Sequence, residues 1–394
     1  MCTQHQMAFR ASLLGVCLLE QAQLLHLGGP VDAKIELYPD LWYHAPTNHL
    51  QGSPMTRIKI PPPISGGLLL SYQCPAECRH CMYACSPRWA GDWIAAEILA
   101  AGLSQLAGGI RPSPWGPQAV SLNHGLHFTG GEPFLNFELL LEAVEIAEEL
   151  KIPSTFVETN AFWCRRDDVT REKLRRLKAA GLKGILISVN PFYAEYVPFE
   201  RTERCIRLSQ EVFGGAVMVY QQEFYRRFRR LGIEDRISVE DYMALAGEAS
   251  LAGGVELFLM GRATRQLRGF YPTYPAHRFF DQPCRPPFLR DWHNHFDNYG
   301  HLMPGYCGGI SLGPWLELDR LTGEGIDLAE RPVLGFLMAG DMRGLFRFAQ
   351  DLGYQASPEG YLSRCDLCLR VRKHLVSVRD WAELQPGEFY AHLA

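Results

Sequence analysis

The 394-residue chain lacks the features that mark membrane proteins, nucleic-acid-binding proteins and small disulfide scaffolds. No run approaches the roughly 18 consecutive apolar residues that a membrane-spanning helix needs. The formal net charge is only -4, so nothing global favours nucleic acid or an anionic membrane as a partner. Internal repeats and low-complexity tracts are also missing. What remains is the composition of an ordinary globular protein, with 47% hydrophobic and 21% charged residues.

Cysteine is plentiful, and its grouping matters more than its number. Of the 12 cysteines, Cys74, Cys78 and Cys81 form a tight group and Cys365 and Cys368 form a pair. A secreted disulfide scaffold is shorter and more densely cross-linked than this chain. We therefore expect a cytoplasmic protein whose thiolates bind metal.

The N-terminal segment, residues 1–64, is expected to be an accessory part that ends in the extended linker Pro61-Pro62-Pro63. Three interpretations of its start stay open. These are a weak signal peptide, an amphipathic accessory helix, and translated sequence upstream of a true start near Met55. The main domain is then expected over residues 65–265 and a second domain over residues 266–394.

Strand and helix patterns alternate through the main domain. The expected strands are residues 67–72, 126–129, 154–158, 184–189, 216–220 and 255–260. The expected helices are residues 93–106, 137–150, 168–180, 200–213 and 239–248. Six such repeats predict an α/β fold with a parallel sheet, of the partial (β/α)6 barrel or doubly wound kind. After residue 261 the chain becomes irregular and rich in proline and aromatic residues, and a helical pattern returns over residues 333–352.

The first cysteine group has a spacing that suits a metal cluster. Three and two residues separate Cys74, Cys78 and Cys81, which follow the first expected strand directly. A structural zinc site normally takes four ligands, and this loop supplies three. A cubane of four irons would use the three thiolates and keep one iron free of protein ligands. The carboxyl end of a strand is also where barrel-like α/β folds keep their active sites.

The cysteine loop, together with Gly130-Gly131-Glu132-Pro133 after the second strand, resembles the radical S-adenosylmethionine (SAM) enzymes. The resemblance covers roughly residues 66–265. It implies a partial TIM-like barrel and a 4Fe-4S cluster on Cys74, Cys78 and Cys81. It also implies a reductive cleavage of SAM that yields a 5′-deoxyadenosyl radical, which abstracts hydrogen from a substrate.

The same resemblance implies cofactor contacts at the mouth of the barrel. His80 stands where the family usually places an aromatic residue near the adenine, and Gly130, Gly131, Glu132 and Pro133 would bind the SAM amino group. Softer assignments are ribose and carboxylate contacts by Thr159, Asn160, Ser188 and Asn190, and a SAM contact by Arg262. The alternatives are simple caps at the strand ends and, for Arg262, an exposed arginine.

A second group of cysteines lies in the tail. Cys284 and Cys307 flank an expected hairpin with its turn at residues 298–300, and Cys365 and Cys368 follow as a CxxC pair. This group resembles the SPASM and Twitch auxiliary domains. It departs from the full SPASM pattern because its cysteines suffice for one additional cluster. The resemblance implies a second 4Fe-4S cluster, and a structural zinc ion on the same four sulfurs is the alternative.

The expected function is therefore a radical SAM oxidoreductase that modifies a peptide or protein side chain, in the manner of a maturase. A small-molecule substrate and radical methyl transfer are the enzymatic alternatives. A metal-stabilised binding or regulatory protein on the same scaffold is the alternative of another class. Family resemblance also implies a low-potential electron donor such as ferredoxin or flavodoxin, with neither nucleic acid nor a membrane as partner.

Overall fold

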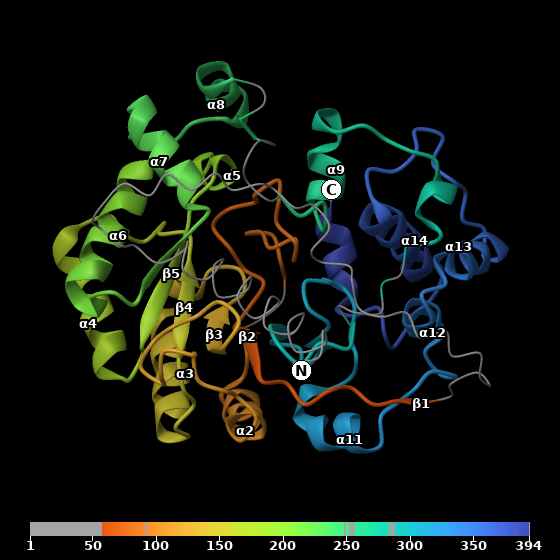
Figure 1. Ribbon diagram of the computed structural model, residues 1–394, viewed down its shortest axis with the longest axis horizontal. Coiled ribbons are helices and arrows are strands. Elements are labelled where there is room, and N and C mark those ends of the chain that lie inside the picture. The colour runs from red at the N-terminus through yellow and green to blue at the C-terminus, as the bar shows by residue number, and fades with distance from the viewer. Residues whose placement is uncertain are drawn as a thin grey trace, which may run out of the picture.

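The computed structural model describes residues 57–90, 93–247, 250–251, 257–282, 284 and 288–393. The interpretations of the start of the chain, including Met55, lie outside these residues. The main sheet has seven strands in the order β6-β5-β4-β3-β2-β7-β8 (Figure 1). Within the described residues, none of the helices combines the length and the apolarity needed to cross a bilayer.

Five parallel strands form the row that the sequence predicts. They are β2 (Ser65–Leu69), β3 (Gly125–Thr129), β4 (Phe156–Thr159), β5 (Gly184–Ser188) and β6 (Val217–Tyr220). The helices between them are α2 (Ala96–Ala107), α3 (Phe137–Glu149), α4 (Asp167–Ala179), α5 (Pro191–Ala194) and α6 (Phe199–Phe213). After β6 come α7 (Gln222–Leu231) and α8 (Val239–Ala246). The predicted alternation is confirmed, with boundaries shifted by a few residues, whereas α7 was not predicted.

The two faces of the sheet bury different side chains. Leu126 and Phe128 of β3 join the large core, to which the helices also contribute. The alternate position in β4, Phe156, belongs to a smaller cluster with Val120, Leu186 and Met218. This alternation follows from the two-residue period of a strand. The side chains of this smaller cluster therefore lie on the inner face of the curved sheet, opposite the helices.

The sixth parallel strand differs from the prediction. Of the residues expected to form it, 255–256 lie outside the described residues and 257–260 form no strand. A sixth parallel strand forms at the opposite end of the row instead, where β7 (Asn294–Phe296) pairs with the side of β2 that faces away from β3. Gly66 permits this pairing, because a Cβ there would lie 2.4 Å from the carbonyl oxygen of Asn294. A three-residue strand with polar side chains gives no periodic signal in the sequence.

The C-terminal part begins with the predicted hairpin. Strand β8 (Leu302–Met303) pairs antiparallel with β7, and Gly300 in the turn has a φ of 88°. The predicted helical pattern over residues 333–352 forms two helices, because Gly340 ends the first one in a left-handed conformation. The remaining elements are β1 (Arg57–Ile58), α9 (Ala263–Gln266), α11 (Leu318–Gly323), β9 (Ile326–Asp327), α12 (Pro332–Ala339), α13 (Met342–Asp351) and α14 (Arg364–Val378).

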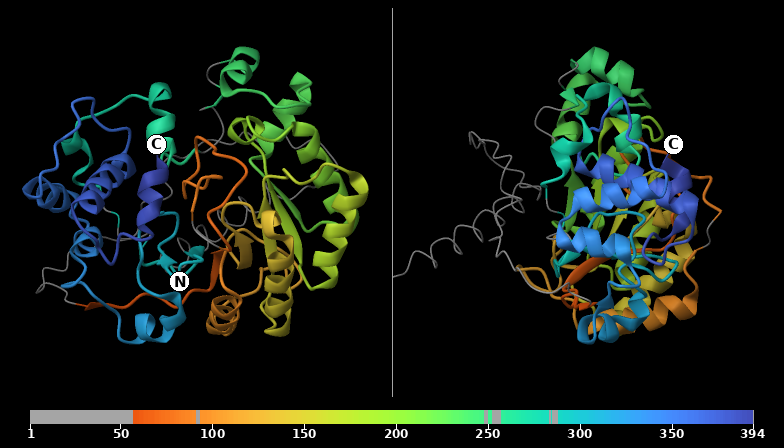
Figure 2. Two further views of the ribbon diagram at one scale, coloured as in Figure 1. Left: turned by 180° about the vertical axis from the view of Figure 1, so that it is seen from behind. Right: turned by 90° about the vertical axis from the view of Figure 1, so that its right-hand side faces the viewer.

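The predicted domains are joined by strand pairing. Strand β7 belongs to the predicted second domain but extends the sheet of the first, and β1 pairs with β9 of the C-terminal part. Figures 1 and 2 show the C-terminal helices beside the strand-and-helix half, with the loop after β2 between the two.

Candidate functional site

The first cysteine loop follows β2 at the edge of the sheet where the parallel strands end. Cys74 and Cys78 are buried, Cys81 is half-buried, and all three thiols are free. The backbone fixes the loop, since the Cys74 amide donates to the Ser86 carbonyl (3.2 Å) and the Cys81 amide to the Cys78 carbonyl (3.1 Å). The predicted ligands therefore lie together in one ordered loop.

Arg262 clamps this loop from the C-terminal side. Its side chain is only 1% exposed. Its guanidinium donates to the carbonyl oxygens of Cys78 (2.9 Å), Ala84 (2.8 Å) and Cys85 (3.0 Å). The alternative of an exposed arginine is thus wrong, and Arg262 holds the shape of the loop.

Two hydrogen-bond donors point at the sulfurs of the loop. The Asn160 amide nitrogen lies 3.7 Å from Cys74 Sγ, and the Cys85 backbone amide donates to Cys81 Sγ (3.3 Å). Hydrogen bonding from Cys85 lowers the pKa of Cys81 to about 6, whereas burial raises the pKa of Cys78. Donors to sulfur stabilise thiolate ligands and help to set the potential of an iron–sulfur cluster. A bound metal replaces the thiol protons of all three residues.

The Gly-Gly-Glu-Pro turn packs directly against the cysteine loop. The Gly131 amide donates to the Ser71 carbonyl (2.8 Å), and the Glu132 amide donates to the Gln73 carbonyl (3.0 Å). A Cβ at Gly131 would lie 1.8 Å from the Gln73 oxygen, and Gly130 has a φ of 123°. Both glycines are therefore required by this contact of two backbones.

Glu132 links the turn after β3 to the end of β4. Glu132 is 1% exposed, and its carboxylate accepts hydrogen bonds from Thr159 Oγ1 (2.9 Å) and from the backbone amide of Asn160 (2.9 Å). Burial raises the pKa of Glu132 to about 7, although these hydrogen bonds act in the opposite direction. The next residue, Pro133, begins the short 3-10 helix Pro133–Asn136.

His80 and the end of β5 form another side of the mouth. The His80 ring stacks on Phe192 with 4.9 Å between centroids, and Asn190 Nδ2 lies 3.1 Å from its Nε2. Burial lowers the pKa of His80 to about 3, so the ring is neutral. The Asn190 side chain also caps the N-terminus of α5, which confirms the alternative of a strand-end cap for this residue. Ser188 forms a side-chain hydrogen bond with Tyr193.

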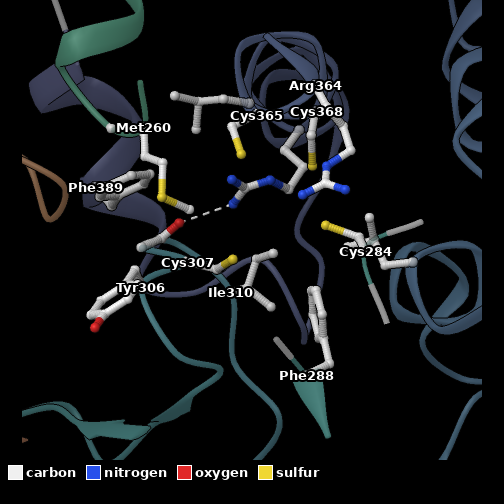
Figure 3. A pocket seen from close by; sticks show the side chains of 15 residues that line it. Met260, Cys284, Phe288, Tyr306, Cys307, Ile310, Arg364, Cys365, Cys368 and Phe389 are labelled. Carbon is white, nitrogen blue, oxygen red and sulfur yellow. Dashed lines mark hydrogen bonds between the residues drawn. The ribbon is translucent and has the colours of Figure 1, made fainter. Parts of the chain in front are cut away.

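The four tail cysteines face one cavity. Figure 3 shows their sulfurs directed toward a common space, with Cys365 and Cys368 on the first turn of α14. The cavity has a volume of about 30 Å³ and is also lined by Met260 and Phe288. The structure thus brings together all the residues of the predicted second set.

The spacing of these sulfurs is wider than a zinc ion needs. A tetrahedral zinc ion with bonds of about 2.3 Å holds its sulfurs about 3.8 Å apart. Among the described residues, no three of the four sulfurs lie within 4.8 Å of one another. The same is true of the sulfurs of Cys74, Cys78 and Cys81 in the described residues, so the spacing does not distinguish a cluster from a zinc ion at the tail site.

Two buried arginines flank the tail cysteines. Arg364 and Arg372 are 8% and 5% exposed, and they bond to Cys365 and Cys368 respectively. Two buried cations need compensating negative charge. Four thiolates around an iron–sulfur core carry a net negative charge, which meets this need.

A short segment connects the two cysteine sites. Met260 and Gly261 line the cavity of the tail cysteines. Gly261 also touches the first loop, since a Cβ there would lie 2.5 Å from the Cys81 carbonyl oxygen. Arg262 follows directly and binds the first loop. The segment of residues 260–262 therefore runs from the tail site to the first cysteine loop.

Six polar residues with possible functional roles were not predicted from the sequence. Five of them are buried, namely His127, His293, His295, Arg364 and Arg372, and the sixth is the half-buried Glu158. Single arginines on a helix give no signal of burial. The only available sign was the spacing of His293 and His295, which places both on one face of a short strand.

Known proteins match this chain through structure. No protein-family profile matches the chain, and no curated protein matches it in sequence. Among solved structures, anSMEcpe with bound AdoMet and Cp18Cys peptide is 13% identical, with 80% of this chain and 98% of that chain covered and a TM-score of 0.39. BtrN in complex with AdoMet and 2-DOIA is 13% identical, with 71% and 93% covered and a TM-score of 0.36. Streptococcus suis SuiB bound to S-adenosylmethionine is 16% identical, with 77% and 75% covered and a TM-score of 0.39.

The three matched proteins are radical SAM enzymes. All three TM-scores are below 0.5.

Proposed function

We propose that the chain is a radical SAM enzyme whose AdoMet-cleaving centre is held by Cys74, Cys78 and Cys81. The observation that carries this proposal is the contact between the cysteine loop and Gly130-Gly131-Glu132, with backbone hydrogen bonds of 2.8 and 3.0 Å. Two structural elements far apart in the sequence meet without intervening side chains. That is the arrangement expected where one loop holds a metal cluster and its neighbour receives the ligand of that cluster.

The donor set fits a 4Fe-4S cluster. Three thiols in one loop, with the Asn160 and Cys85 donors at their sulfurs, provide three ligands and leave one iron for AdoMet. When bound, the cluster would pass one electron to AdoMet, break its C5′–S bond, and yield methionine and a 5′-deoxyadenosyl radical that takes hydrogen from the substrate. A low-potential donor of the ferredoxin or flavodoxin class would supply that electron.

The protein's own residues would orient AdoMet and exclude water. Gly130 and Gly131 expose backbone at the edge of the loop, and Glu132 fixes this turn against Thr159 and Asn160. His80 stands over Phe192 and contributes a neutral aromatic surface on the opposite side. Their predicted contacts with AdoMet, like those of Pro133, Ser188, Asn190 and Arg262, are part of this proposal.

We further propose that Cys284, Cys307, Cys365 and Cys368 hold a second 4Fe-4S cluster. The convergence of four thiols on one cavity and the two buried arginines support a metal site of net negative charge, and the resemblance of the cysteine pattern to the SPASM and Twitch domains supports a cluster. Four protein ligands would leave no iron open, so this site would carry electrons or contact substrate instead of cleaving AdoMet.

The proposed substrate is a peptide or protein side chain. The tail cysteines, which resemble those of the peptide-modifying branch, support this choice, and anSMEcpe was solved with a peptide bound. BtrN was solved with 2-DOIA, so both a peptide library and small molecules belong in a substrate screen.

The test is incubation of the anaerobically reconstituted, dithionite-reduced chain with AdoMet. We expect release of 5′-deoxyadenosine and methionine, and loss of this release in Cys78→Ala. Formation of S-adenosylhomocysteine would instead indicate methyl transfer. Binding of AdoMet without either product would contradict catalysis and favour a binding or regulatory protein.

A further inference from the structure

Three histidines meet inside the sheet at a place that neither cysteine site uses. His127 lies in β3, His295 in β7, and His293 directly before β7. One ring nitrogen from each lies within 4.8 Å of the other two. All three side chains are buried, with exposures of 2%, 4% and 3% for His127, His293 and His295.

Hydrogen bonds direct two of the rings inward. His293 Nδ1 lies 2.8 Å from the Leu122 carbonyl oxygen, and His295 Nδ1 lies 2.8 Å from the Gly305 carbonyl oxygen. A carbonyl oxygen only accepts hydrogen bonds, so each Nδ1 carries the proton and each Nε2 presents a lone pair. Metal-binding histidines are typically held in this way, with one nitrogen bonded to a carbonyl and the other on the metal.

The third ring leaves a buried nitrogen unused. His127 Nε2 has no hydrogen-bond partner among the described residues. A buried polar atom without a partner costs free energy unless something binds it. The nearest charged group is Glu158, whose Oε1 lies 3.6 Å away while its Oε2 accepts from Thr129 (2.7 Å).

The neighbouring strand β2 leaves room for the three rings. Gly67 in β2 provides the space, because a Cβ there would lie 2.3 Å from His127 Nε2 and 2.7 Å from His295 Cδ2. A larger residue at Gly67 would displace two of the three rings.

We propose that His127, His293 and His295 bind one divalent first-row metal ion of the Zn²⁺ class. Glu158 or a water molecule would complete the coordination. Three imidazoles and one oxygen suit Zn²⁺ and disfavour Mg²⁺ and Ca²⁺, which prefer oxygen ligands. Zinc–nitrogen bonds of about 2.0–2.1 Å require nitrogens about 3.4 Å apart, a distance within reach of small ring rotations.

The histidine cluster lies on the same face of the sheet as the proposed reaction site. The His127 ring stacks on Phe156 of the inner cluster with 4.9 Å between centroids, so it lies on the inner face of the sheet. His127 precedes Gly130 by three residues, and Glu158 precedes Asn160 by two. Glu158 has 27% side-chain exposure and is the least buried of the four groups, so the coordination position beside it is the accessible one. The ion would lie below the mouth of the barrel and separate from both cysteine sets.

The first experiment measures zinc per chain by mass spectrometry in anaerobically purified full-length protein supplied with Zn²⁺. We expect about one zinc in the wild type and in Cys365→Ala/Cys368→Ala, and at least a tenfold loss of zinc affinity in His293→Asn/His295→Asn. His277→Asn, an exposed histidine on the C-terminal half, is the matched control and should keep its zinc. Zinc that disappears with the cysteines and persists in the histidine variant would overturn the proposal.

Cobalt provides a second readout that does not depend on activity. Co²⁺ at the three histidines should give visible d–d bands without thiolate-to-cobalt charge transfer, and a strong charge-transfer band would place the ion at the cysteines instead. If the double variant fails to fold, judged by loss of its iron, Gly67→Ala decides the matter. Full zinc binding in a folded Gly67→Ala variant would contradict the site. Because zinc and cobalt binding need no AdoMet cleavage, this test stands whether or not the proposed enzymatic function holds.

Discussion

The two cysteine sites of this protein are built in opposite ways. Cys74, Cys78 and Cys81 lie in one loop whose shape is set by backbone hydrogen bonds, two glycines and the clamp of Arg262. The tail site draws its ligands from three separate segments, and two buried arginines stand beside it. A loop with three ligands keeps a coordination position open for chemistry, whereas four converging ligands close the site. Under the proposed function, this difference would separate a catalytic centre from a supporting one.

The largest expected effect is the loss of AdoMet cleavage when a cysteine of the first site, but not of the tail site, is replaced. Cys78→Ala should reduce 5′-deoxyadenosine formation at least about 1,000-fold, because the AdoMet-binding cluster is lost. Cys368→Ala, the matched change in the tail, should keep measurable cleavage and lose only the second cluster. The measurements are product release and iron per chain. Equal loss of all iron in both variants would mean that the sites do not form independently.

The clamp of the first loop is the next target. Arg262→Gln leaves several buried carbonyls without donors and should lower the free energy of unfolding by about 3 kcal/mol. Iron should be lost from the first site before the second, because three of the four hydrogen bonds of the guanidinium go to the first loop and the fourth goes to the His392 carbonyl. The control is Arg265→Gln at an exposed position three residues away. Chemical denaturation and iron content measure the effect, and equal stability of both variants would contradict the clamp.

The arginines of the tail site should tune a redox potential. Replacing buried Arg372 by Gln removes a positive charge beside the cluster and should lower its reduction potential by on the order of 100 mV. Arg343→Gln, at an exposed arginine of the same half, should leave the potential unchanged. Redox titration followed by electron paramagnetic resonance (EPR) tests this expectation. A site without any redox signal would support zinc and contradict the second cluster.

The smallest effect concerns pH and Glu132. Its pKa is raised by burial to about 7, above the value of an unfolded glutamate. The native state therefore holds the proton more tightly, and stability is lost as pH rises from about 4.5 to about 7, by up to about 3 kcal/mol. Glu132→Gln should abolish this part of the pH dependence. Glu138→Gln, an exposed glutamate on α3, should retain it in denaturation curves measured across that range.

Sequence reasoning was most successful where a physical signal is local. The strand–helix alternation and the hairpin before Cys307 were both predicted, because each depends on neighbours along the chain. The two cysteine sets were also identified from spacing. Their standing as ligands is a prediction that iron analysis tests.

The rest depends on contacts between distant segments. The pairing of β7 with β2 is set by Gly66 and by space in the folded sheet, and three-residue strands carry no readable period. The inward turn of Arg262 follows from loop carbonyls more than 170 positions away in the chain. The histidine cluster joins residues over 160 positions apart, and only the fold brings them together.

The most direct test of the central claim compares the two clusters in isolation. The variant Cys365→Ala/Cys368→Ala keeps only the three-ligand site, and Cys74→Ala/Cys78→Ala keeps only the four-ligand site. EPR spectra of both reduced variants are recorded with and without AdoMet. We predict that AdoMet changes the signal of the three-ligand site and leaves the four-ligand signal unaltered. An AdoMet-induced change confined to the tail site would contradict the assignment of Cys74, Cys78 and Cys81 as the catalytic centre.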